Sequence, residues 1–99
     1  MKGYVIIDNV IIDAGAYTEF IEKIPAAIEA NGGRVLLRTS DIEPFQGDWE
    51  PERLVVLEFD NIEAARGFVN SAEYAALYDV RMRALKSRVV VVEGYDSEA

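Results

Sequence analysis

The order of apolar and amphipathic segments restricts the fold of this chain more than any other feature. Four short segments are rich in valine, isoleucine and leucine and are typical of β-strands: residues 2–12, 34–39, 53–59 and 88–95. Between the first two, apolar side chains recur every three or four residues, as on one face of an amphipathic helix. A second stretch with this helical spacing, interrupted once, separates the last two strand-like segments. The predicted order is therefore strand, helix, strand, strand, helix, strand.

Local signals mark where the two helices begin and end. Asp13 can cap the first helix, and the glycines after Asn31 suit a left-handed turn at its C-terminus. We expect Pro25 to kink or split this helix, because proline lacks a backbone N–H and crowds the preceding turn. Asp60, with a glutamate three residues later, resembles a capping box for the second helix, and Ser71 can cap a continuation after the interruption.

Right-handed crossovers turn this order into a known architecture. It is the α+β, ferredoxin-like β-α-β-β-α-β plait, a four-stranded antiparallel sheet with two helices on one face. The expected strand order across the sheet is fourth, first, third, second. A chain of 99 residues has the usual size of one domain, so we expect a single domain over residues 1–99 with a frayed tail at 96–99.

Side chains alternate along a strand, which gives the sheet two faces, and both are apolar in this chain. One predicted face holds Val5, Ile7, Val35, Leu37, Val55, Leu57, Phe59, Val90 and Val92. The other holds Ile6, Leu36, Leu54, Val56, Val89 and Val91. Two helices can cover only one face, and each large apolar side chain left in water forgoes about 1.5–3 kcal/mol. A second copy of the chain is the simplest cover, which predicts a two-fold homodimer with face-to-face sheets; an apolar ligand or a different partner protein is the alternative.

The second face also carries polar side chains. We expect the first and third strands to run in the same direction, which brings Asp8 and Glu58 to one end of the sheet, where Arg34 begins the second strand. Arg38 then sits further along, with Tyr4 nearer the opposite end. A partly apolar cavity with polar groups at its mouth is typical of a small-molecule site.

These polar residues suggest chemical roles, each with a structural alternative. Arginine matches a carboxylate with two parallel hydrogen bonds, so Arg34 and Arg38 are candidates to hold an anionic substrate. Glu58 or Asp8, if half-buried, is a candidate catalytic base, and Tyr74 is a candidate proton donor. The structural alternative is an ion-pair network between strands, and for Tyr74 a core position with a polar tip.

Trp49, the single tryptophan of the chain, lies among turn-forming residues between the second and third strands. The indole either stacks on a planar substrate or anchors the loop and faces the partner subunit, which is the more frequent role for tryptophan at such a boundary. Trp49 and Tyr4 complete the candidate substrate-binding residues.

Composition excludes several classes of function. The chain has no histidine and no cysteine, which removes the Ser-His-Asp and Cys-His catalytic groups, disulfides, and histidine-ligated zinc and haem. Ten basic residues are scattered among eighteen acidic ones, for a net charge of −8, which opposes binding to nucleic acid or to anionic membranes. No carboxylate cluster has metal-loop spacing, so we predict no metal and no cofactor. With no signal peptide and no apolar run of membrane-spanning length, we expect a cytoplasmic protein.

Five stretches of the chain, in order, carry a resemblance to a known family: KGYVI, GGRVLLR, GDWEPERLVVLEF, IEAARGFVNSAEY and VVVVEGY. Together they span nearly the whole chain and resemble the domain of unknown function 1330 family, within the dimeric α/β-barrel group of ferredoxin-like proteins. Two turns depart from that pattern. Thr39 and Ser40 stand where the family often has two glycines, and Ala72 stands where it often has proline. The resemblance implies the same fold and a dimer, but it carries no activity.

The function predicted from these features is the binding of a small anionic or aromatic molecule in a cavity over the open sheet face of a homodimer. One alternative is a cofactor-free acid/base enzyme, isomerase-like or monooxygenase-like, since wider relatives in the barrel group include such enzymes. The other is a dimeric interaction module without catalysis, in which the charges serve only register and solubility.

Overall fold

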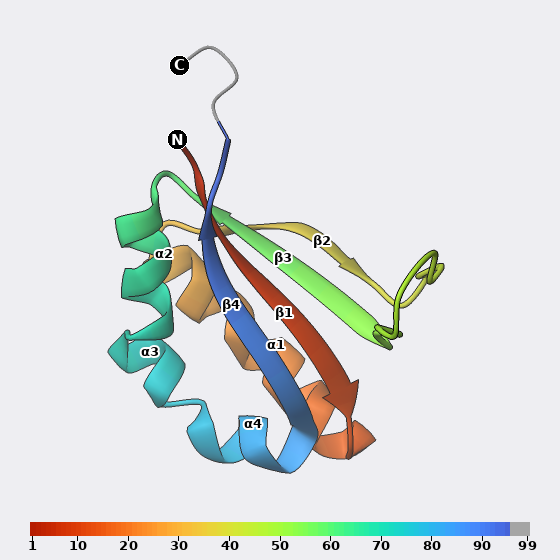
Figure 1. Cartoon of the computed structure of the whole chain (residues 1–99). Coiled ribbons are helices and arrows are strands. Elements are labelled where there is room, and N and C mark those ends of the chain that lie inside the picture. Colours follow the sequence, from red (N-terminus) through yellow and green to blue (C-terminus); the bar gives the residue numbers. More distant parts are fainter. Residues whose placement is uncertain (96–99) are drawn as a thin grey trace.

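Figure 1 shows the computed structural model, which describes residues 1–95; the predicted frayed tail at 96–99 lies outside the described residues. The strands are β1 (Gly3–Ile11), β2 (Arg34–Thr39), β3 (Arg53–Phe59) and β4 (Leu85–Glu93). The helices are α1 (Ala14–Ala30), α2 (Ile62–Val69), α3 (Ala72–Ala75) and α4 (Tyr78–Ala84). The predicted second helix is thus a succession of three short helices.

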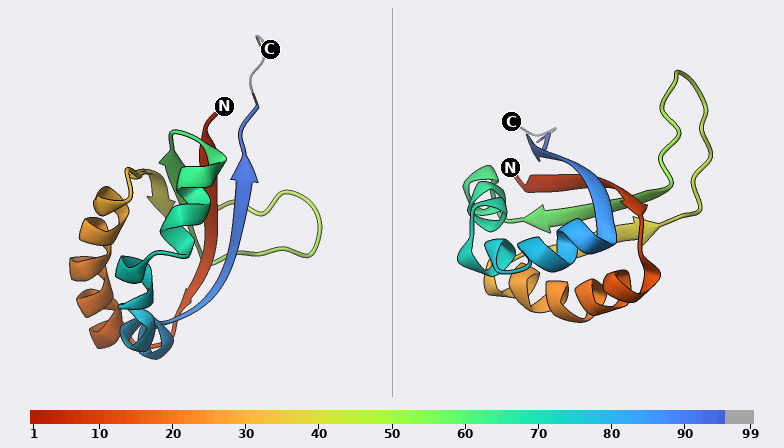
Figure 2. Two further views of the ribbon diagram at one scale, coloured as in Figure 1. Left: turned by 90° about the vertical axis from the view of Figure 1, so that its left-hand side faces the viewer. Right: turned by 90° about the horizontal axis from the view of Figure 1, so that it is seen from below.

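The four strands form one sheet in the order β2-β3-β1-β4, and every neighbouring pair is antiparallel. The helices lie on one side of this sheet, and the other side is open (Figure 2). This arrangement confirms the predicted α+β, ferredoxin-like plait. Within residues 1–95, no helix combines the length and the apolar character that crossing a bilayer requires.

Both ends of α1 form as their sequence signals predict. The Asp13 side chain accepts a hydrogen bond from a backbone N–H of the first turn at 2.9 Å. At the other end Gly32 has a φ of 76°, and the N–H groups of Gly32 and Gly33 donate back to carbonyls of the last turn. The helix continues through the exposed Pro25, so the predicted split does not occur. Packing of its buried face holds the helix together despite the missing hydrogen bond.

The N-terminal cap of α2 differs from the prediction. Asn61, not Asp60, precedes the first turn, and its Oδ1 accepts a hydrogen bond from the N–H three residues later at 2.8 Å. Asp60 instead lies 3.4 Å from the ammonium group of Lys2. Ser71 caps α3 as predicted, since its Oγ accepts a hydrogen bond from the Tyr74 N–H at 3.1 Å.

The core lies between the helices and the inner face of the sheet. Its largest fully buried side chains are Phe59, Phe68, Leu57 and Val5. The rings of Phe59 on β3 and Phe68 on α2 lie 5.5 Å apart, measured between centroids. Sheet and helix layer approach so closely that β1 begins with a glycine, Gly3, whose missing side chain would collide with the backbone of Asn61.

In β4 the side chains face opposite to the prediction. Val91 lies opposite the buried Val5, so it and Val89 face the helices. Val90 and Val92 therefore lie on the open face, where Val89 and Val91 were predicted. Alternation within a strand separates two sets of side chains, but only pairing with a neighbour decides which set meets the core.

In β2 a β-bulge reverses the alternation partway along the strand. Val35 and Leu37 lie opposite adjacent residues of β3, which leaves Leu36 as an extra residue. Leu37 consequently turns to the open face, and Arg38 turns to the helix side, opposite the buried Val55. The predicted faces of Leu37 and Arg38 are wrong because one extra residue reverses every side chain beyond it.

The strands β1 and β3 run in opposite directions, so the prediction that they share a direction is wrong. A helical crossover keeps the direction of the chain from β1 to β2, but the loop after β2 reverses it. Glu58 therefore lies opposite Tyr4, near the start of β1, whereas Asp8 lies opposite Leu54, near its end. The two carboxylates predicted to share one end of the sheet lie at opposite ends.

The open face of the sheet is apolar, as predicted, although its members differ. They are Ile6, Leu37, Leu54, Val56, Val90 and Val92. Leu37 and Val90 are 44% and 53% exposed. The loop between β2 and β3 projects from this side of the sheet, away from the helices (Figure 2).

Candidate functional site

Two polar clusters occupy opposite ends of the open sheet face. The Glu58 cluster consists of Tyr4, Arg34 and Glu58, and the Asp8 cluster consists of Asp8, Trp49 and Arg88. Each joins a carboxylate on a central strand to an arginine on an edge strand. The predicted single cluster is therefore divided in two.

In the Glu58 cluster, two donors hold one carboxylate. Arg34 Nε donates to Glu58 Oε1 at 2.7 Å, and the Tyr4 hydroxyl donates to Oε2 at 3.1 Å. Burial acts to raise the pKa of Glu58, but the hydrogen bonds from Arg34 and Tyr4 outweigh it and hold the pKa below its ordinary value. Burial, together with the neighbouring Glu58 carboxylate, raises the pKa of Tyr4.

This geometry weakens the acid/base role predicted for the cluster. A carboxylate with a lowered pKa is a poor proton acceptor, and Glu58 is already hydrogen-bonded through both oxygens. Arg34 is likewise engaged with Glu58, so it is not free to hold a substrate anion unless that pair opens.

In the Asp8 cluster, both donors bind the same oxygen. Asp8 Oδ2 accepts from Trp49 Nε1 at 2.8 Å and from a terminal nitrogen of Arg88 at 3.0 Å. The Asp8 side chain is only 10% exposed. Its second oxygen, Oδ1, accepts no hydrogen bond from residues 1–95. One oxygen of a well-anchored carboxylate thus remains available to a donor from outside.

Sequence reasoning missed Arg88. It stands directly opposite Asp8 in the pairing of β4 with β1. The sequence offered a signal, since Arg88 begins the valine run of the last strand, but the antiparallel register that places it beside Asp8 is not visible in one sequence. Trp49 anchors its loop to the sheet as the sequence suggested, through its indole N–H.

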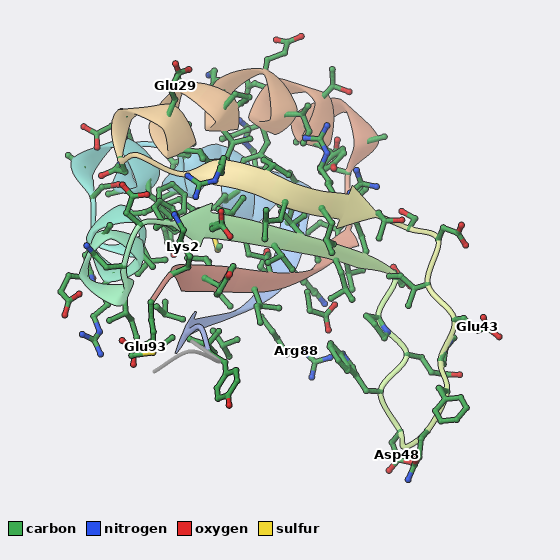
Figure 3. All side chains as sticks on the ribbon, turned by 90° about the horizontal axis from the view of Figure 1, so that it is seen from above. Lys2, Glu29, Glu43, Asp48, Arg88 and Glu93 are labelled. Carbon is green, nitrogen blue, oxygen red and sulfur yellow. The ribbon has the colours of Figure 1, made fainter. Side chains whose placement is uncertain are left out.

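The Asp8 cluster borders a hollow of about 770 Å³ on the open side of the sheet. This outer hollow is lined by Ile6, Asp8, Asp48, Trp49, Glu50, Arg88 and Val90. Figure 3 shows Arg88 between the sheet and the loop, and Asp48 at the far end of the loop. The floor is apolar, the loop forms one wall, and the lining includes three carboxylates and a single guanidinium group. The hollow is therefore negatively charged overall.

Arg38 and Tyr74 lie on the other side of the sheet, so the structure does not bring them to Asp8 or Glu58. The Tyr74 ring packs on Phe68, with 4.9 Å between the ring centroids. The Arg81 guanidinium lies over the Tyr74 ring, 4.1 Å from its centroid. Tyr74 is half-buried and packed, which fits the structural alternative stated for it.

Arg38, Tyr74 and Arg81 border a second, smaller space of about 40 Å³ between the helices and the sheet. The lining of this inner cavity is largely apolar, and its polar members are Asn9, Tyr17, Arg38, Tyr74, Arg81 and Ser87. Among residues 1–95, no three carboxylates gather closely enough to suggest a metal centre at either space.

Solved structures share this fold at low sequence identity. The RPA0582 protein of unknown function from Rhodopseudomonas palustris has a TM-score of 0.75 at 15% identity, over 96% of this chain and 83% of that one. A candidate antibiotic biosynthesis monooxygenase from Nitrosomonas europaea has a TM-score of 0.56 at 15% identity, over 94% of this chain and 89% of that one. A dimeric ferredoxin-like protein of unknown function from Bacteroides fragilis has a TM-score of 0.53 at 14% identity, over 94% and 96%. At such identities the likeness shows the fold alone.

A family model agrees with the resemblance seen in the sequence. No curated protein matches the chain at a significant level. The model described as "Domain of unknown function (DUF1330)" matches residues 2–95, which is nearly the whole chain. The predicted resemblance is confirmed, and the chain belongs to the DUF1330 family.

Proposed function

We propose that the protein is a homodimeric small-molecule binding module, in which a second copy covers the open sheet face and the outer hollow receives the ligand. The observation that carries the ligand site is Asp8: a nearly buried carboxylate, fixed through one oxygen, lines a hollow that also has an apolar floor and a tryptophan wall. An apolar pocket with one or two fixed polar groups is the usual composition of such a site.

The chemistry of the open face supports a second copy as its cover. Six large apolar side chains stand on this face, and a surface of that kind favours burial. Although the chain carries a net charge of −8, Arg34 and Arg88 neutralise Glu58 and Asp8 on this face. Two such faces can therefore meet without strong repulsion. The Bacteroides fragilis protein of the same fold is described as dimeric, which is consistent with this assembly.

Of the two predicted kinds of ligand, the lining of the outer hollow favours an aromatic molecule over an anion. An aromatic ring can stack on Trp49 and rest on Ile6 and Val90. An anion finds only Arg88, which Asp8 already engages, and meets the carboxylates of the loop. The ligand best suited to this hollow is a flat aromatic molecule, neutral or cationic, with an N–H or O–H donor for Asp8 Oδ1.

The acid/base enzyme alternative rests on fewer groups than the sequence suggested. Glu58 is fully engaged, and Tyr74 lies across the sheet from both carboxylates. Asp8 remains the single candidate base, through its Oδ1. The fold shared with a candidate monooxygenase supplies no catalytic residue for this chain. The arrangement therefore supports binding better than catalysis.

A pair of probes of opposite charge tests the proposed ligand class. Tyramine is an aromatic cation with hydrogen-bond donors, and 4-hydroxyphenylacetate is its anionic counterpart. In a titration followed by the NMR signal of the Trp49 indole N–H, we expect tyramine to bind about tenfold or more tightly than the anion, because the hollow is acidic.

A matched pair of variants assigns the effect to Asp8. Asp8→Asn is expected to weaken tyramine binding by about tenfold or more, since it removes the charge that receives the donor. Glu43→Gln removes a carboxylate from the loop between β2 and β3 that does not line the hollow. It is expected to bind tyramine as the wild type does. Equal binding of the two probes, or an unaffected Asp8→Asn variant, refutes the proposed site.

A further inference from the structure

In the inner cavity, positively charged side chains gather without a carboxylate. It lies between α1, α4 and the inner face of the sheet, on the other side of the sheet from the outer hollow. Its lining includes Arg38 and Arg81 but no aspartate or glutamate. Arg81 is half-buried and Arg38 is exposed, and in a chain with eighteen acidic and ten basic residues such a pair of arginines is expected to attract a carboxylate of the protein itself. Neither arginine forms an ion pair with any carboxylate of residues 1–95.

Two donors at this cavity also lack partners. The Arg81 Nε–H is buried and forms no hydrogen bond within the described part of the chain. Asn9 is only 5% exposed, and its side chain accepts a hydrogen bond from the Ser87 hydroxyl, but its Nδ2 amide donates to none of residues 1–95. Buried polar groups are normally paired, so the Arg81 Nε–H leaves one buried donor at this cavity that an acceptor can satisfy.

A groove between α1 and β2 adjoins the inner cavity. Its volume is about 240 Å³. The groove and the inner cavity share four lining residues: Ile24, Ile28, Val35 and Arg38. Arg38 therefore stands where the two spaces meet, and the β-bulge at Leu36 places it on this side of the sheet. The groove lining also includes Glu29 and Arg34, whose charges are opposite, so Arg38 gives the groove a net positive charge that attracts anions.

We propose that the inner cavity, with the groove beside it, binds a small planar organic anion whose carboxylate is received by Arg81 and Arg38. An arginine side chain matches a carboxylate with two parallel hydrogen bonds, and Asn9 Nδ2 supplies a further donor. The aliphatic side chains shared by cavity and groove offer a flat apolar surface to the rest of the molecule. The cavity alone has room for about three water molecules, so the carboxylate occupies it and the apolar part extends into the groove.

This site is independent of the proposed function. It lies within one copy of the chain and across the sheet from Trp49, so it requires neither the dimer nor a ligand in the outer hollow. It also selects the opposite charge, because the outer hollow is acidic and the inner cavity is basic.

Benzoate and benzamide, which share a shape and differ in charge, test the proposal on the wild-type protein. In ¹⁵N–¹H NMR titrations, we expect sodium benzoate to shift the Asn9 side-chain amide and the backbone signals of Arg38 and Ser87. Benzoate should bind about tenfold or more tightly than benzamide, because charge-assisted hydrogen bonds to arginine are lost with the amide. No shift of these signals with benzoate, or equal binding of the two compounds, overturns the proposal.

Arginine variants identify the groups that receive the anion. Arg38→Gln and Arg81→Gln are each expected to weaken benzoate binding by about tenfold or more. Arg66→Gln removes the same charge from an exposed position on α2 that has no ion pair in residues 1–95, and it should bind benzoate as the wild type does. Because Arg38 is exposed, its variant should fold even if the Arg81 variant does not.

Trp49→Phe separates this site from the outer hollow. We expect this variant to bind benzoate with unchanged affinity, because the inner cavity does not contact the loop. An equal loss of benzoate affinity in Arg66→Gln, or a loss in Trp49→Phe, would show that benzoate binds elsewhere and would overturn the assignment.

Discussion

The charge of Glu58 depends on two neighbours, and this dependence links a single residue to the stability of the fold. In the folded chain its pKa is held below the ordinary value because hydrogen bonds from Arg34 and Tyr4 outweigh the opposing effect of burial. A lowered pKa means that folding favours the ionised form. The contribution of Glu58 to stability is therefore complete above its ordinary pKa of 4.5 and disappears as the pH falls through the lowered pKa of the folded state.

Glu58→Gln tests this linkage. At pH 7 the variant should have a smaller free energy of unfolding than the wild type, because Arg34 and Tyr4 lose a charged acceptor. As the pH falls below the ordinary pKa of 4.5 and through the lowered pKa of the folded state, the difference should shrink, since the wild-type carboxylate becomes protonated as well. Urea unfolding between pH 7 and pH 3 measures both effects, with Glu43→Gln as the control. A difference that stays constant down to pH 3 would show that the charge of Glu58 does not stabilise the fold.

The ends of helices and the register of strands show which elements the sequence specifies locally. Asp13, Ser71 and the glycines after Asn31 act as predicted, because each bonds to backbone groups a few residues away. The bulge at Leu36 depends instead on pairing with a strand distant in sequence, and no local signal fixes such a pairing. The bulge moves Arg38 to the helix side, so the candidate site was only partly predictable.

The cap of α2 offers a quantitative test of a local signal that was misassigned by one residue. Asn61→Ala should reduce the free energy of unfolding by about 1 kcal/mol, because it removes the hydrogen bond that its side chain accepts at the first turn. Asp60→Ala should cost less, since Asp60 contributes only exposed ion pairs. Chemical denaturation of both variants measures the difference. A greater loss of stability in Asp60→Ala than in Asn61→Ala would show that Asp60 caps the helix.

At the scale of the whole molecule, the sheet separates two chemically different sides. The helix side holds the core and the basic inner cavity. The open side holds an apolar surface, two arginine–carboxylate ion pairs and the acidic outer hollow. The sequence predicted the uncovered apolar face, because its strands carry more apolar side chains than two helices can cover. It did not predict that Arg38 lies on the helix side, which depends on the β-bulge in β2, nor that Asp8 and Glu58 lie at opposite ends of the open face, which depends on the direction of β3.

The molecular mass in dilute solution tests most directly whether this open face is covered by a second copy. By sedimentation equilibrium at micromolar concentrations, we expect the wild type to have twice the chain mass of 11.0 kDa. Val90→Glu places a charge on the open face and should yield a folded monomer, whereas Met82→Glu, at a similarly exposed position on α4, should remain a dimer. A wild-type protein of 11.0 kDa throughout the concentration range, or a Val90→Glu variant that remains dimeric, would contradict the account.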